Sequence, residues 1–205
     1  MDLAQLQATR RFVVRQRFTM MVNRYVVTAV RPDGSGEHGD HGDHTVAFAQ
    51  QKRMAFREQV TFYTDESRRA ELFSFRARSV MDVGTAYDVV APDGTALGLF
   101  RKDFGASLLR STWHLEARGL PPATGHERSL PLAIVRRVWD FVPFLGDVPF
   151  PFPYHFDFDA GGRRVMTVDK RISLRDTYVV DIADDMIDRR LAIAQAVALD
   201  ALQSR

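Results

Sequence analysis

The sequence has no cysteine, only 3 lysines among its 28 basic residues, and no long uncharged hydrophobic run. The absence of cysteine excludes disulfides, thiolate metal sites and cysteine nucleophiles. A formal net charge of +2 does not indicate a nucleic-acid-binding protein. The N-terminus carries Asp2 where a secretory signal has basic residues, and no apolar signal region follows, so we expect a cytoplasmic protein, with peripheral membrane association as an extension of that location.

Recognisable catalytic motifs are also missing. The sequence contains no Gly-x-Ser-x-Gly, no His-Glu-x-x-His, no phosphate-binding loop and no dinucleotide fingerprint. His114, His126 and His155 are isolated from one another in the sequence, and we interpret them as structural. We therefore expect no enzymatic activity and no cofactor, while residues far apart in sequence can still converge in a fold.

The segment from Leu191 to Leu199 is apolar on every side of the helix that it would form. Such a helix has to be enclosed by protein or lipid. The region from Ile182 to Leu202 contains several charged residues, whereas a membrane span needs about 20 mostly uncharged residues. We therefore predict that protein surrounds this C-terminal helix.

Most of the remaining sequence has the alternation of β-strands. In residues 11–18, Phe12 and Val14 alternate with Arg15 and Arg17, and similar patterns recur along the chain. A barrel of about eight strands is filled by its own side chains, whereas an 11-stranded can holds a central helix. The sequence predicts one mainly β domain over residues 1–205: a closed antiparallel β-barrel of about 12 strands that encloses the C-terminal α-helix.

A series of short motifs supports this architecture. In order along the chain these are Lys52-Arg53, Phe62-Tyr63-Thr64-Asp65, Leu72-Phe73-Ser74-Phe75-Arg76, Tyr87-Asp88-Val89-Val90, Asp93-Gly94, Leu97-Gly98-Leu99, Tyr178 to Ile182, and Leu191 to Asp200. With these motifs the sequence resembles the LURP-one-related family of the tubby C-terminal domain and phospholipid scramblase superfamily. The resemblance covers most of the chain outside residues 31–44 and 120–153, and it implies a 12-stranded barrel around a central helix.

Two segments depart from that family pattern. Residues 129–139 place Ile134, Val135, Val138 and Trp139 at helical spacing, with Ser129 as an N-cap, and predict an extra inserted helix. Residues 148–158 carry a large apolar or aromatic side chain at every even position, with prolines between the first four. We interpret this Phe/Pro-rich segment as a lid over one barrel mouth; the alternative is an edge that inserts into a bilayer interface or a partner protein's groove.

Two sets of residues are candidate metal ligands. His38, His41 and His44 lie in a glycine-rich loop with Asp40 and Asp43; they suit Zn²⁺ or Ni²⁺, although such a loop does not hold ligands in place. The acidic group Asp181, Asp184, Asp185 and Asp188 precedes the terminal helix. The scramblase resemblance implies Ca²⁺ there, whereas acids in a first helical turn are expected from the helix dipole alone. Asp200 lies late in the apolar helix, and we expect it to meet an arginine of the wall or a backbone donor.

The candidate anion-binding residues are basic side chains on the predicted strands: Arg15, Arg17, Arg76, Arg78, Lys170, Arg171 and Arg175. The tubby resemblance implies phosphoinositide-like recognition by such residues, while outward-facing arginines are also an ordinary solvated surface. Three functions follow as hypotheses: a non-enzymatic binding or regulatory module at anionic phospholipid surfaces, a scramblase-like lipid-translocating protein, and a small-ligand enzyme that uses the barrel mouth. The first includes a protein partner at residues 148–158 as a further possibility.

Overall fold

The structure is a computed structural model that describes residues 2–18, 22–31, 33, 45–52, 59–78, 86–103, 111–129, 155–171 and 176–203. Twelve strands and two helices lie in these ranges. The helices are α1 (Leu3–Ala8) and α3 (Arg189–Gln203). The strands are β1 (Arg11–Phe18), β2 (Val22–Ala29), β3 (Thr45–Lys52), β4 (Gln59–Tyr63), β5 (Glu71–Ala77), β6 (Ala86–Val90), β7 (Ala96–Asp103), β8 (Thr112–Ala117), β9 (Ala123–Glu127), β10 (His155–Ala160), β11 (Arg163–Arg171) and β12 (Thr177–Ile182).

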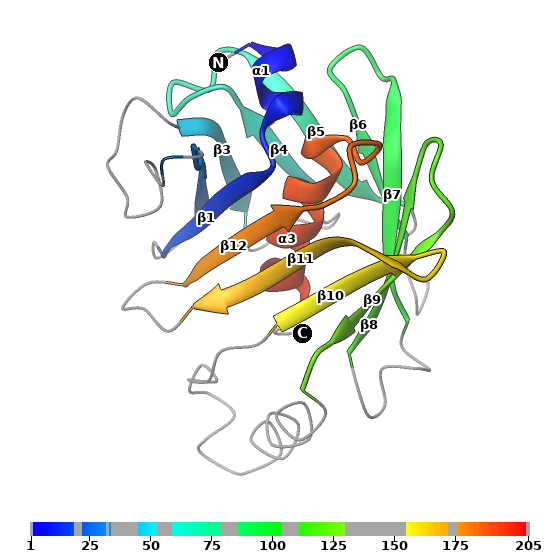
Figure 1. Cartoon of the computed structure of the whole chain (residues 1–205). Helices are drawn as coiled ribbons and strands as arrows, with labels where there is room; N and C mark the ends of the chain where they lie inside the picture. The colour runs from blue at the N-terminus through cyan, green and yellow to red at the C-terminus, as the bar shows by residue number, and fades with distance from the viewer. Residues whose placement is uncertain are drawn as a thin grey trace.

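All twelve strands form one closed antiparallel barrel, in which each strand pairs with its neighbour in sequence and β1 pairs with β12 (Figure 1). The closing register places Phe12 opposite Val180 and Val14 opposite Tyr178. Closure leaves no unpaired strand edge, which removes the main route to edge-to-edge association. The predicted fold class is therefore confirmed, including the number of strands and the enclosed helix.

The alternation read from the sequence determines which side chains fill the barrel. On β5, Phe73 and Phe75 are fully buried, whereas Arg76 between Phe75 and Ala77 is exposed. Aromatic rings from neighbouring strands form a continuous layer inside the wall: Phe62 stacks on Phe73 with ring centroids 4.1 Å apart, and Phe100 lies 5.3 Å from both Phe75 and Tyr87. These rings are the wall against which the helix packs.

Helix α3 runs through the middle of the barrel (Figure 1). Every residue from Leu191 to Leu199 is 0% exposed, as predicted from a segment that is apolar all round. Within the described ranges, no helix is long and apolar enough to cross a bilayer. The interior is thus occupied by a helix whose surface is apolar because it faces wall side chains in every direction.

Gly98 on β7 allows the wall to approach the helix closely. A Cβ atom at this position would lie 2.5 Å from the carbonyl oxygen of Glu116 and 2.6 Å from Cδ2 of Leu191. The backbone of Gly98 also has a φ of +153°, which side-chain-bearing residues rarely adopt. Only glycine therefore fits where β7 meets the first turns of α3.

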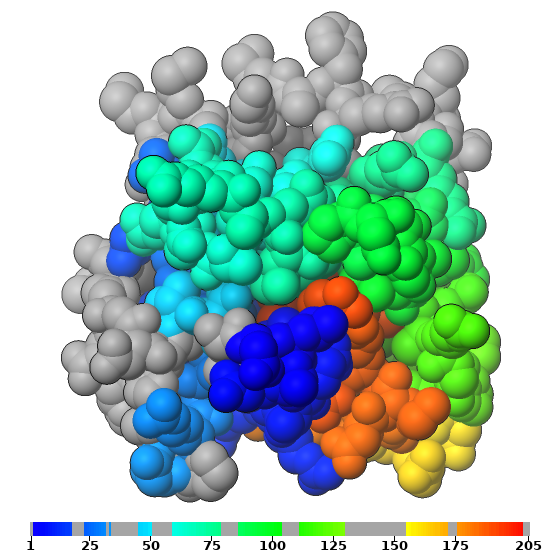
Figure 2. Space-filling view, turned by 90° about the horizontal axis from the view of Figure 1, so that it is seen from above, coloured from blue at the N-terminus to red at the C-terminus, as the bar shows by residue number. Residues whose placement is uncertain are grey.

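One mouth of the barrel is covered by α1 and the turn that leads from β12 into α3 (Figure 2). Asp2 caps α1 through a capping box with Gln5, and Leu6 is buried against the core. The sequence analysis missed both α1 and β9. The predicted inserted helix at residues 129–139 and the lid at residues 148–154 lie outside the described residues, apart from Ser129, whereas Phe156 and Phe158 of the same alternating run are buried on β10.

Candidate functional site

The outer surface of β1, β2 and β11 gathers arginines from separate parts of the sequence. Arg17 lies directly opposite Arg24 across the β1–β2 pair. Arg15 lies in register with Thr177 of β12, which in turn pairs with Arg171 of β11. All four point away from the core, because the inward positions of these strands are taken by residues such as Val14 and Tyr25.

A fifth arginine extends this surface across β3. Arg24 is opposite Gln50 on β3, and the Arg68 guanidinium donates to Gln50 Oε1 at 3.1 Å from the turn between β4 and β5. We call Arg15, Arg17, Arg24, Arg68 and Arg171 the arginine belt. It spans neighbouring strands from β11 through β12, β1 and β2 to β3.

Charges in the belt act on one another. The pKa of Arg15 is lowered from its ordinary value, first by partial burial and then by the charge of Arg171. Like charges directly opposite on a strand pair, as at Arg17 and Arg24, are also unfavourable. Glu66 reaches the belt, with Oε1 3.4 Å from Arg17 Nη1. The belt is therefore a surface where arginines repel one another. A bound anion would reduce this electrostatic repulsion.

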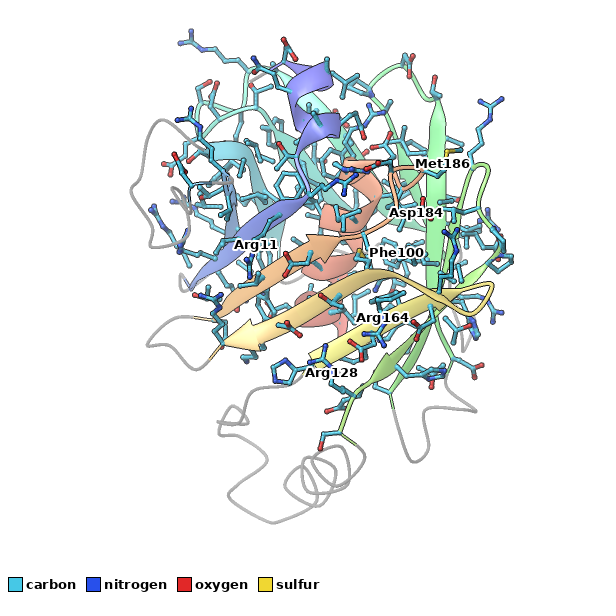
Figure 3. The ribbon with its side chains drawn as sticks, viewed as in Figure 1. Arg11, Phe100, Arg128, Arg164, Asp184 and Met186 are labelled. Carbon is cyan, nitrogen blue, oxygen red and sulfur yellow. The ribbon has the colours of Figure 1, made fainter. Side chains whose placement is uncertain are left out.

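A second group of outer arginines pairs with acids. On the face formed by β9, β10 and β11, Asp157 lies 2.5 Å from Arg128 and 2.9 Å from Arg164. Figure 3 labels these two arginines. The pKa of Asp157 is lowered because the bonds and charges of these arginines outweigh the opposing effect of burial, which is the largest single contribution. This face is therefore a strand-to-strand ion-pair network.

The predicted basic residues do not form one patch. Arg15, Arg17 and Arg171 lie together in the belt, whereas Arg76 and Arg78 are on β5, and Arg78 pairs with Asp88 at 2.7 Å. Lys170 occupies an inward register position on β11, with Nζ 2.8 Å from Asp176 and 5.7 Å from the ring centroid of Tyr178. Arg175 lies outside the described residues. The sequence analysis also missed Arg24, which strand register brings to the belt, and Arg68, which reaches it from a turn through Gln50.

The acidic group before α3 is spread over a strand, a turn and a helix cap. Asp181 is on β12 with Oδ1 3.2 Å from Arg11 Nε, and Asp184 is 3.4 Å from Arg163. Figure 3 shows Asp184 in the turn ahead of α3, near Met186. These acids precede the first helical turn: α3 begins at Arg189 and has no acid in its first turn, because the chain after β12 makes a turn before it becomes helical.

Asp188 is the residue that caps α3. Its Oδ1 accepts from the backbone N–H of Arg190 at 2.9 Å and from Gln7 Nε2 at 2.8 Å. Burial would raise the pKa of Asp188, but the bonds from Arg190 and Gln7 lower it overall. The Asp185 carboxylate is shared by Arg10, at 2.6 Å, and Arg189, at 3.1 Å. These contacts fit the capping interpretation.

Calcium binding by the acidic group before α3 stays a prediction, because the described acids are not arranged as a metal site. Across the ranges that the structure describes, no three His, Asp or Glu side chains come together as a metal site. His38, His41 and His44 lie outside those ranges. His155 and His114 pair singly with Asp169 at 2.8 Å and Asp103 at 3.1 Å.

Among the residues that the structure describes, Asp200 meets two tyrosines, and not the arginine or backbone donor that we expected. Its carboxylate accepts hydrogen bonds from the hydroxyl groups of Tyr178 and, at 2.9 Å, Tyr25. The Tyr25 hydroxyl in turn accepts from Gln16 Nε2 at 3.3 Å. The side chain keeps some exposed surface, yet burial is the largest effect on it and raises the pKa of Asp200 to about 6, against the opposing bonds from the two tyrosines. The two tyrosines can bond to this acid because their rings pack in the barrel wall while their hydroxyl groups reach the C-terminal end of the helix.

Together these features define a closed β-barrel built around an internal helix, with a concentrated basic surface on its outside. The chain matches the LURP-one-related family model over residues 45–200 and belongs to that family. Strands β1 and β2, which complete the barrel, precede the matched region. A comparison with curated proteins found no match.

Proposed function

We propose that this chain is a non-enzymatic binding module that docks its arginine belt on anionic phospholipid surfaces. The observation that carries the proposal is the concentration of five arginines over adjacent strands, two of them directly opposite one another. Each basic residue near an anionic membrane surface contributes about 1 kcal/mol to binding. The tubby-like resemblance of the sequence points to the same class of ligand.

The filled interior favours a protein that acts through its outer surface. Helix α3 and the aromatic layer occupy the barrel, with Phe100, Trp113 and Leu199 each at 0% exposure. An enzyme at the barrel mouth would need an open pocket with a converging acid and base. The scramblase alternative requires the terminal helix to lie in the bilayer, whereas here the helix is surrounded by protein.

Vesicle co-sedimentation tests the proposal. We expect the protein to bind phosphatidylserine-containing vesicles and to lose this binding as salt is raised, because salt screens exposed charges. The double variant Arg24→Glu with Arg171→Glu reverses two exposed belt charges and should weaken binding at least tenfold. Equal binding to neutral phosphatidylcholine vesicles would reject a role for anionic lipid.

A matched variant separates the belt from net charge. Arg76→Glu with Arg101→Glu changes the charge by the same amount at two exposed strand positions away from the belt. We expect this variant to bind anionic vesicles within about threefold of the original protein, since it leaves the belt's local field intact. Similar losses in the two double variants would show that overall charge, and not the belt, is responsible.

A further inference from the structure

The two ends of α3 are held by different chemistry. At its first residue, the Arg189 side chain is 2% exposed and donates to the carbonyl oxygens of Ile187 at 2.7 Å and Thr9 at 2.9 Å. Gln7 accepts from the Arg189 backbone N–H at 3.1 Å. This end is therefore tied to α1, to its C-cap residue and to the turn before α3 by bonds that do not change between pH 5 and pH 8, because arginine stays charged.

The other end of α3 is held by a titratable group. Asp200 accepts from Tyr25 on β2 and Tyr178 on β12, and it is the carboxyl that these two wall residues share. The charged groups that act on it are Lys170 of β11 and Asp176 ahead of β12, with opposite signs. Of the other strands packed on α3, β7 has Lys102 at an inward register position near this mouth, while β1 and β5 present Gln16 and Phe75, which do not titrate.

The middle of the helix contains a second buried polar side chain, Gln195. Gln195 is 0% exposed, and neither atom of its side-chain amide has a hydrogen-bond partner among the described residues. Burying an unpaired amide is unfavourable. The half of α3 that contains Gln195 and Asp200 is thus bound less firmly than the half that begins at Arg189.

We propose that the C-terminal half of α3 is a proton-controlled closure of the barrel. With Asp200 protonated the last two turns stay seated against β2 and β12; with Asp200 ionised they separate from the wall more often, exposing Leu199 and Leu202. The sign follows from the direction of the pKa change. Because the closed state raises the pKa of Asp200 to about 6, the closed state binds the proton more tightly, so closure is favoured at low pH and loses this contribution as pH rises from about 4 through about 6.

Hydrogen exchange of the backbone amides of residues 196–203 tests the closure. After correction for intrinsic exchange, we expect about tenfold less protection at pH 7.5 than at pH 5 in the unmodified protein, as the linkage of one group titrating near 6 requires. In Asp200→Asn the side chain is neutral at both pH values and has the same shape. Protection of these amides should then be equal at pH 5 and pH 7.5.

Two further variants keep the test decisive. Asp188→Ala removes the cap at the firm end and should lower protection of the helix by the same factor at both pH values, because the pKa of Asp188 lies below this pH window. Tyr178→Phe removes a donor to the Asp200 carboxylate and should move the midpoint of the pH effect upward, which gives a readout even if Asp200→Asn does not fold. A pH effect that persists in Asp200→Asn, or a midpoint unmoved in Tyr178→Phe, would overturn the proposal.

Discussion

Replacing Arg189 with methionine is expected to lower the free energy of unfolding by about 3 to 5 kcal/mol. The guanidinium is almost fully buried and donates to the backbone carbonyls of Thr9 and Ile187 and to the Asp185 carboxylate. Methionine fills a similar volume but donates no hydrogen bond, so these carbonyls lose their partner inside the protein. Urea unfolding followed by circular dichroism measures the effect.

Arg10→Ala is the matched control for that experiment, because Arg10 contacts the same Asp185 carboxylate from the surface. Both side chains of the Arg10–Asp185 pair are more than 60% exposed, at 63% and 66%. An exposed pair of this kind contributes at most about 1 kcal/mol. If the two variants lost the same stability, the carbonyl contacts of Arg189 would not be what fastens α3.

Much of the fold was predictable because its signal is local. The alternation in residues 11–18 and 59–63 predicts strands with one solvent-exposed face and one buried face. The apolar character of Leu191 to Leu199 on all sides predicts an enclosed helix. Strand β9 escaped prediction because its inward residues include Ala123 and Gly125. Gly125 is needed there because the ring of Phe158 occupies the place of its side chain, and such a strand shows no hydrophobic alternation.

The candidate site was less predictable because it depends on register. Arg17 and Arg24 are seven positions apart in sequence, and nothing in the composition says that they lie opposite one another. Arg171 comes within one strand of Arg15, with Thr177 between them, only through the closure of β1 on β12. Arg76 and Arg78 have the same local pattern and lie on a different face. The sequence therefore predicts which face of a strand a residue occupies, but it does not predict which residues lie beside it on the neighbouring strands.

Asp200 shows the same limit inside the barrel. The sequence correctly indicates that an acid late in an enclosed helix needs a partner. Its partners are the tyrosines at positions 25 and 178, which read as ordinary core aromatics on their strands. Only the position of the helix inside the closed wall brings both hydroxyls to one carboxylate.

Gly98→Ala is expected to destabilise the fold by about 3 kcal/mol or more, through two effects that add. The new methyl group would lie 2.5 Å from the backbone oxygen of Glu116, which cannot move without breaking the β7–β8 pairing, and 2.6 Å from Leu191. Forcing an extra methyl group into a packed core costs about 1 to 3 kcal/mol. Holding a non-glycine residue at a φ of +153° adds a further cost of about 1 to 3 kcal/mol.

Gly94→Ala separates these two effects. Gly94 also has a positive φ, +84°, but a Cβ there would meet nothing within 4 Å. This variant should therefore lose only the backbone contribution, about 1 kcal/mol, and should keep the unmodified protein's protection of the α3 amides. The excess loss in Gly98→Ala then measures mainly the crowding of a Cβ atom against Glu116 of β8 and Leu191 of α3. If the two variants unfolded at the same denaturant concentration, the close approach of wall and helix at Leu191 would not contribute to holding the helix inside.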